Sequence, residues 1–134
     1  MGNKHAHVEK AQRNEAALSR FNFEPDLYEW YITVSFYASV HWLRAFLAVG
    51  GRGLREEVHY DQFPHQVREV YRAHFGQNAQ AAETALNAFQ IIKKLSQRAR
   101  YGCESPAWYA RETGTADAAL KTVRDFVTGR GVEP

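Results

Sequence analysis

The sequence predicts an all-α protein that folds as a single domain. Apolar residues recur with helical spacing in nearly every segment, and no run shows the strict alternation of a β-strand. The chain has 134 residues, which suits one domain, and its 45% apolar and 24% charged residues are typical of a globular protein. A net charge of +2 does not by itself indicate a nucleic-acid binder, so such a contact has to come from local clusters of basic residues.

The first helix is expected over residues 6–21, where apolar and charged side chains share helical spacing. Pro25 ends this region because proline lacks the N–H that a helix interior needs, and Asp26 is the expected N-cap of the next helix. That central helix covers Trp30–Val49, is apolar around almost its whole circumference and stops at Gly50. Its length would suit a membrane span, but polar residues interrupt it, so we expect a buried helix of a soluble protein.

Four polar side chains lie on one stripe of this central helix: Thr33, Tyr37, His41 and Arg44. They are spaced at i, i+4, i+8 and i+11, which places them within one narrow sector of a helix. An unpaired polar group inside a core costs on the order of 1–3 kcal/mol. The stripe therefore has two interpretations: the four side chains satisfy one another inside the protein, or they face a site or a second subunit.

Three further helices are expected in the second half of the chain. The third runs over Pro64–Phe75, since proline suits a first helical turn, and the fourth over Ala79–Arg100. A looser segment, Cys103–Gly114, follows the fourth helix. Thr115 is the expected N-cap of a last helix over Ala116–Thr128.

The third helix carries basic residues on one face. His65, Arg68 and Arg72 share this face at i, i+3 and i+7, whereas His74 follows Val70 by four residues and is expected toward the packing side. Such a basic face is either an ordinary solvated surface or a site that binds phosphate. For His74 the alternatives are a core or interface histidine and a functional one.

A second basic cluster lies near the end of the fourth helix. Lys93, Lys94, Arg98 and Arg100 occur in a stretch that has no acidic residue between Glu83 and Glu104. Cations are favourable at a helix C-terminus because the macrodipole is negative there. The cluster is therefore either a set of terminal cations or a patch that binds phosphate.

Other motifs are absent from the sequence. It has no Walker loop, dinucleotide fingerprint, zincin helix or esterase elbow, so no cofactor is expected, and the six histidines lack the spacing of a metal site. The single cysteine, Cys103, suits a reducing cytosol, and the charged first twenty residues do not form a signal peptide. We expect a cytoplasmic protein that uses neither metal nor membrane.

Four segments resemble the small bacterial members of the HEPN superfamily. They are, in order, His7–Asn14 (HVEKAQRN), Trp30–Leu47 (WYITVSFYASVHWLRAFL), His65–Arg68 (HQVR) and Leu95–Tyr101 (LSQRARY). FYASVH is similar to the family's Phe-Tyr-Ala-x-x-His helix, and the fourth segment contains its Ser-x-x-Ala-Arg-Tyr ending. The resemblance covers the first four expected helices, roughly three quarters of the chain. It implies an up-and-down bundle of four to five helices, over residues 1–134, that forms a homodimer.

The resemblance also implies an activity. Many HEPN proteins are metal-independent endoribonucleases that act as toxins or in antiphage defence, often beside a nucleotidyltransferase antitoxin. Their signature is an arginine, a polar residue and a histidine after four to six intervening residues. Arg68, Glu69 and His74 resemble it, with five residues between Arg68 and His74. This implies that Arg68 stabilises phosphate and that His74 acts as acid or base.

An endoribonuclease that cleaves RNA by 2′-hydroxyl attack, leaving a 2′,3′-cyclic phosphate, is therefore the favoured interpretation. The residues expected to bind the substrate are His65, Arg72, Lys94, Arg98 and Arg100. Those expected to support a site or the core are Tyr37, His41 and Arg44. The alternative is a HEPN module without catalysis, which binds a partner or serves as a structural subunit of a larger defence complex.

Overall fold

Five α-helices account for most of the computed structural model, which describes residues 4–21, 27–49, 59–76 and 79–130. The elements are α1 (Lys4–Phe21), α2 (Tyr28–Val49), the 3-10 turn η2 (Tyr60–Gln62), α3 (Phe63–Phe75), α4 (Gln80–Tyr101) and α5 (Pro106–Thr128). All regular structure within these ranges is helical. The predicted all-α class is confirmed. The expected cap Asp26 and the expected stop Gly50 lie outside the described residues.

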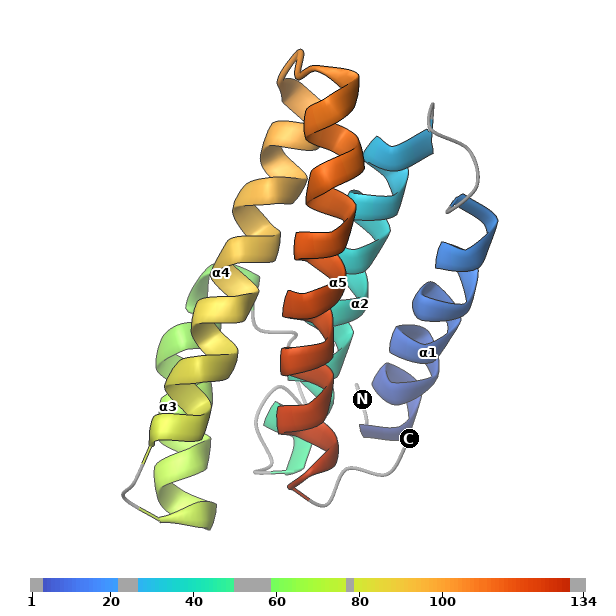
Figure 1. The fold of residues 1–134 in the computed structure, drawn as a ribbon. Coiled ribbons are helices and arrows are strands. Elements are labelled where there is room, and N and C mark those ends of the chain that lie inside the picture. Colours follow the sequence, from blue (N-terminus) through green and yellow to red (C-terminus); the bar gives the residue numbers. More distant parts are fainter. Residues whose placement is uncertain (1–3, 22–26, 50–58, 77–78, 131–134) are drawn as a thin grey trace.

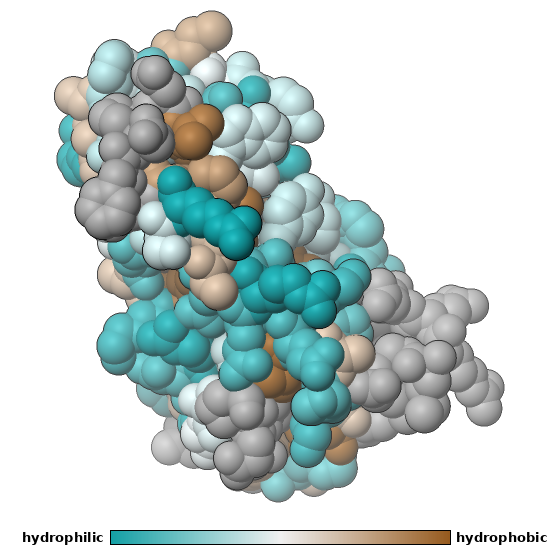
Figure 2. Space-filling view, turned by 90° about the vertical axis from the view of Figure 1, so that its right-hand side faces the viewer, coloured by the Kyte–Doolittle hydropathy of each residue, from teal (hydrophilic) through white to brown (hydrophobic). Residues whose placement is uncertain are grey.

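The four long helices α1, α2, α4 and α5 alternate in direction along the chain, so α1 and α4 run antiparallel to the central α2 and α5 runs parallel to it (Figure 1). Helices α1, α4 and α5 all pack against α2, and the shorter α3 packs against both α2 and α4. Most side chains of α1 are polar. The face of the molecule that carries α1 is mostly hydrophilic (Figure 2). The result is a bundle in which one apolar helix is surrounded by amphipathic ones.

The core is built around large side chains of α2. Phe36, Trp42, Leu43 and Phe46 are each at most 1% exposed. The indole Nε1 of Trp42 donates a hydrogen bond to Oε2 of Glu15 at 2.6 Å, which satisfies its polar atom inside the bundle. By length and composition α2 is the one described helix that could cross a membrane. The core helix of a soluble protein has the same properties, and α2 is mostly buried by its neighbours.

Hydroxyl groups inside α2 are satisfied by the helix itself. Thr33 Oγ1 donates to the carbonyl of Glu29 at 2.8 Å, and Ser35 Oγ donates to the carbonyl of Tyr31 at 2.9 Å. Such bonds to a preceding carbonyl let a small polar residue pack in a core without an unpaired donor. Thr33 therefore needs no partner elsewhere on the polar stripe.

Helix α5 begins a full ten residues before its expected start. Ser105 is its N-cap and accepts a hydrogen bond from the backbone N–H of Trp108 at 3.1 Å, and Pro106 occupies the first turn. The predicted looser segment is therefore confirmed over residues 103–105 but wrong from Pro106 onward, and the predicted cap Thr115 is wrong. The early start lets the buried Trp108 pack in a small cluster with residues of α2 and α4, which outweighs the low helix propensity of Gly114.

The other helix boundaries differ from the expected ones by one or two residues. Helix α3 begins at Phe63, one residue before Pro64, and ends where Gly76 adopts a φ of 103°. This left-handed conformation favours glycine, so the identity of residue 76 fixes the end of α3. Helix α4 runs through Tyr101, one residue beyond the expected end.

Candidate functional site

Arg68 is already engaged by a carboxylate of the neighbouring helix. Its Nε and Nη2 atoms donate to the two oxygens of Glu83, on α4, at 2.6 and 2.8 Å. This paired hydrogen bond raises the pKa of Arg68 above its ordinary value and lowers the pKa of Glu83. Both side chains remain partly exposed, so a phosphate that takes the paired Nε and Nη2 donors of the guanidinium has to replace Glu83.

His74 lies on the surface, which corrects its expected place toward the packing side. The inward position in the last turn of α3 is taken by Phe75, whose ring stacks on Phe46 with centroids 5.9 Å apart and lies 5.6 Å from the ring of Tyr71. Phe75 is still 37% exposed, but its contacts with Phe46 and Tyr71 cover part of an apolar ring, which is more favourable than covering an imidazole. His74 is thereby left exposed to solvent at the end of the helix.

The structure does not bring Arg68 and His74 together within one chain. His74 is six positions after Arg68 on α3, which corresponds to about 120° around the helix axis and about 9 Å along it. Of the other basic residues on α3, His65 lies 3.1 Å from Glu69 through Nε2, and Arg72 is exposed with no ion pair to a described residue. One copy of α3 therefore presents separate groups on different sides.

The basic cluster on α4 is divided between two sides of that helix. Arg98 faces α5: its Nη2 lies 2.9 Å from Glu104 and its guanidinium lies 4.9 Å from the centroid of the Trp108 ring. Lys93 faces η2, where Nζ donates to Asp61 Oδ1 at 2.5 Å. These two cations are already neutralised by carboxylates.

Arg100 instead joins α4 to α2. Its Nη1 donates to the hydroxyl of Tyr37 at 3.4 Å, its Nε donates to the carbonyl of Ser96 at 3.3 Å, and its guanidinium lies 5.2 Å from the centroid of the Tyr101 ring. Lys94 is exposed on α4 and has no ion pair with a described residue. Arg100 and Lys94 are thus the two members of the cluster whose charge no described carboxylate balances.

The polar stripe of α2 does not bond to itself. Tyr37 reaches Arg100 of α4, the Nδ1 atoms of His41 and His7 lie 3.1 Å apart, and the guanidinium of Arg44 lies 5.9 Å from the Phe63 ring centroid. Tyr37, His41 and Arg44 therefore each meet a different element, α4, α1 or α3, whereas Thr33 bonds within α2. The stripe marks the side of α2 that lies between α1 and α4. His7 begins the first HEPN-like segment, but the sequence did not indicate its contact with His41.

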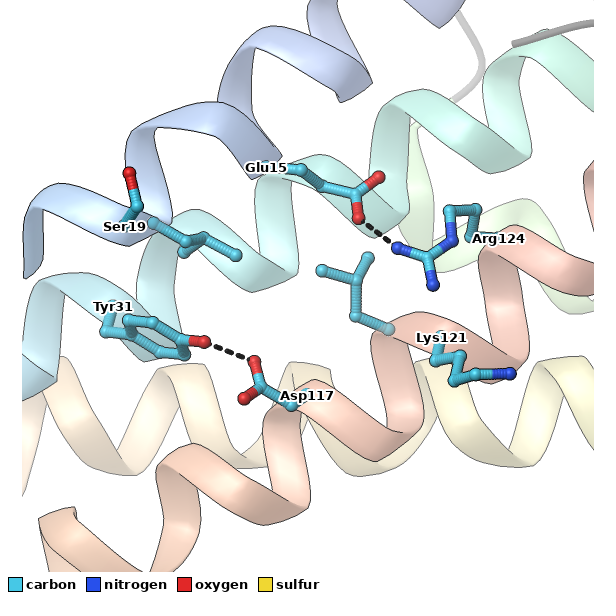
Figure 3. Close-up of a pocket in the computed structure, with 8 residues that line it drawn as sticks. Glu15, Ser19, Tyr31, Asp117, Lys121 and Arg124 are labelled. Carbon is cyan, nitrogen blue, oxygen red and sulfur yellow. Dashed lines mark hydrogen bonds and ion pairs between the residues drawn. The ribbon is translucent and has the colours of Figure 1, made fainter. Parts of the chain in front are cut away.

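A second feature that sequence reasoning missed is an open pocket of about 440 Å³ between α1, α2 and α5 (Figure 3). Arg124 Nη1 donates to Glu15 Oε1 at 2.5 Å on one side of it, and the hydroxyl of Tyr31 donates to Asp117 on the other. Burial, followed by this hydrogen bond, raises the pKa of Tyr31 above its ordinary value. These residues come from three distant segments, so no local spacing could have revealed them.

Within the described ranges, no three histidine, cysteine, aspartate or glutamate side chains form a group able to hold a metal ion. Comparison with protein-family models, with curated proteins and with solved structures finds no match to this chain. The fold defines the class of the protein as a small all-helical bundle domain. Its function has to be argued from the side chains of the bundle.

Proposed function

We propose that this protein is a HEPN-type domain of the cytoplasm that acts on RNA as a metal-independent endoribonuclease. The proposal is supported by the order of the HEPN-like segments, which fall on α1, α2, α3 and α4 of a helical bundle. Arg68 and His74 are its catalytic residues. A role as a toxin or antiphage component follows, with a nucleotidyltransferase antitoxin or a larger defence complex as partner.

The exposed imidazole of His74, on the same helix as Arg68, is the observation that carries the proposal. A histidine titrates near neutral pH and can remove the proton of a ribose 2′-hydroxyl or protonate the leaving 5′-oxygen. The planar guanidinium of Arg68 matches the oxygens of a pentacovalent phosphorane. The products are a 2′,3′-cyclic phosphate and a free 5′-hydroxyl, and no metal takes part.

The active site requires two copies of α3. Because Arg68 and His74 point to different sides of one helix, a twofold dimer that pairs two α3 helices places the arginine of one copy near the histidine of the other. His65 and Arg72 then lie beside the same RNA. The Glu83 carboxylate holds Arg68 ordered until a phosphate replaces it.

A second candidate function is a HEPN module without catalysis, which binds a partner or serves as a structural subunit. The ion pair between Arg68 and Glu83 favours this alternative, because it neutralises the arginine that a ribonuclease needs. The two described pockets also lie between other helices, away from α3.

Cleavage of single-stranded RNA in EDTA separates the two functions. The wild-type dimer should produce cyclic-phosphate ends, and Arg68→Ala and His74→Ala should each abolish them without a large change in Tm, since both residues are exposed. Arg111→Ala, an exposed cation on α5, is the matched control and should cleave like wild type. RNA that stays intact with wild-type protein across varied substrates would select the binding module.

A further inference from the structure

One stripe of the central helix reaches solvent between α1 and α4, and it carries large aromatic side chains. Trp30 is 50% exposed and Tyr37 is 42% exposed, although most residues around them on α2 are buried. The two are seven residues apart, so they share a face and lie about 10 Å apart along the helix axis. A bundle of this size gains nothing in stability from leaving such rings in water.

Arg100 joins this stripe to a third exposed ring. Its guanidinium lies between the hydroxyl of Tyr37, at 3.4 Å, and the ring of Tyr101, at 5.2 Å from the centroid. Tyr101 is 79% exposed, the highest value among the large hydrophobic side chains of the described residues. A positive charge is therefore held between aromatic rings from two different helices.

The charge around these rings is positive. Lys94 precedes Tyr101 by seven residues and shares its face of α4. Asp61 and Glu104, two carboxylates that contact α4, are already paired with Lys93 and Arg98. Glu29, which precedes Trp30, is the one acidic residue of α2. Arg100 consequently presents its charge to the solvent beside Tyr37 and Tyr101, and Lys94 presents its charge about 9 Å further along α4, on the side away from Trp30.

We propose that these five residues, the aromatic-cation surface, bind single-stranded RNA: Trp30, Tyr37, Lys94, Arg100 and Tyr101. Unpaired bases stack on the exposed rings, and the phosphates between them contact the two cations. Base stacking on aromatic side chains beside cationic groups is the general means of holding a single strand, whereas a duplex hides its bases. The positive charge distinguishes this surface from an apolar face for a protein partner.

The aromatic-cation surface lies on a path to α3, which links it to the proposed function. This inference rests on that proposed function because it takes RNA as the ligand. Glu83, the partner of Arg68, precedes Lys94 by eleven residues and Tyr101 by eighteen, so all three lie along one line of α4. The distance from Tyr101 to Glu83 along the helix is about 27 Å. A single RNA strand that follows α4 from Tyr101 to Glu83 therefore reaches Arg68, the partner of Glu83.

Intrinsic fluorescence offers a direct test, because Trp30 is the exposed tryptophan while Trp42 and Trp108 are buried. His74→Ala protein, which leaves RNA uncut, is titrated in EDTA with single-stranded oligouridylate and with a duplex RNA of equal length. The single strand should quench the Trp30 emission and bind more tightly than the duplex. Equal affinity for both, or no quenching, overturns the proposal.

Substitutions in the same background identify the residues involved. Trp30→Ala and Tyr101→Ala should each weaken binding roughly tenfold, and Lys94→Gln and Arg100→Gln should each lower the salt dependence of log K by about 0.7. Lys121→Gln, at an exposed position of α5, is the matched control and should bind as before. If the first four variants keep the wild-type Tm and bind RNA with unchanged affinity, the proposed RNA-binding surface is wrong.

The outcomes also separate this inference from the proposed ribonuclease. Oligouridylate that binds through Trp30 and Tyr101 but is not cut by wild-type protein supports the surface and removes the catalytic claim. RNA that is cut while these substitutions leave its affinity unchanged overturns the surface alone. If Trp30→Ala weakens self-association in sedimentation and leaves RNA affinity unchanged, a second copy covers the face and the proposal is wrong.

Discussion

At the scale of single residues, the ion pair between Arg68 and Glu83 controls what the basic face of α3 can do. Two hydrogen bonds of 2.6 and 2.8 Å fix the guanidinium against a carboxylate, yet both side chains are well exposed. Exposed pairs contribute little to stability, typically less than about 1 kcal/mol. The pair therefore acts mainly on the availability of Arg68 for an incoming phosphate.

Glu83→Gln tests this role. Loss of the carboxylate should free Arg68 and raise the affinity for single-stranded RNA, while the free energy of unfolding changes by less than about 1 kcal/mol. Binding titrations and urea unfolding measure the two effects, and Asp125→Asn, which removes an exposed carboxylate paired with Lys121 on α5, is the control. Weaker binding by Glu83→Gln would mean that Arg68 does not meet RNA.

Tyr31 gives a prediction for the dependence of stability on pH. Burial and the hydrogen bond to Asp117 raise its pKa above the ordinary 10.0, so the folded protein keeps a proton that the unfolded chain loses. The contribution of Tyr31 is fully present below pH 10 and declines as the pH rises further. Urea unfolding of wild type and Tyr31→Phe should show a difference of about 1 kcal/mol near neutral pH that shrinks near pH 11. A constant difference would argue against the raised pKa.

At the scale of the helices, most of the fold could be predicted from the sequence. The spacing of apolar residues located all five helices because their amphipathic faces must cover α2. The start of α5 could not be predicted, because Gly114 followed by Thr115 is typical of a loop that ends at a helix N-cap when only neighbouring residues are considered. The cap by Ser105 and the packing of Trp108 against α2 and α4 decide that start, and the packing depends on tertiary contacts.

Two glycine substitutions test these helix assignments. Gly114 lies inside α5, and a Cβ there would meet no atom within 4 Å, so Gly114→Ala should stabilise the protein by up to about 1 kcal/mol. Gly76 has equal space around it but a φ of 103°, so Gly76→Ala should destabilise by about 1–2 kcal/mol. Thermal unfolding checks both. Destabilisation by Gly114→Ala would indicate that the segment before Thr115 is not helical.

At the scale of the whole molecule, the candidate sites were only partly predictable. Local spacing indicated the basic residues of α3 and α4, but their partners lie 15 residues away for Arg68 and 63 residues away for Arg100. Periodicity also placed His74 toward the packing side, because spacing alone does not reveal that its side chain is exposed at the end of α3. Which cations are neutralised and which are available depends on how the helices pack.

Complementation between two inactive variants is the most direct test of a ribonuclease site shared by two copies. Arg68→Ala and His74→Ala chains are unfolded together, refolded as a mixture and assayed for RNA cleavage in EDTA. Mixed dimers then combine the intact arginine of one chain with the intact histidine of the other. Half of the dimers are mixed and each has one complete site of two, so a shared site should recover roughly a quarter of the wild-type activity. A mixture that forms dimers but remains as inactive as either variant alone, while refolded wild type cleaves, would contradict the shared site.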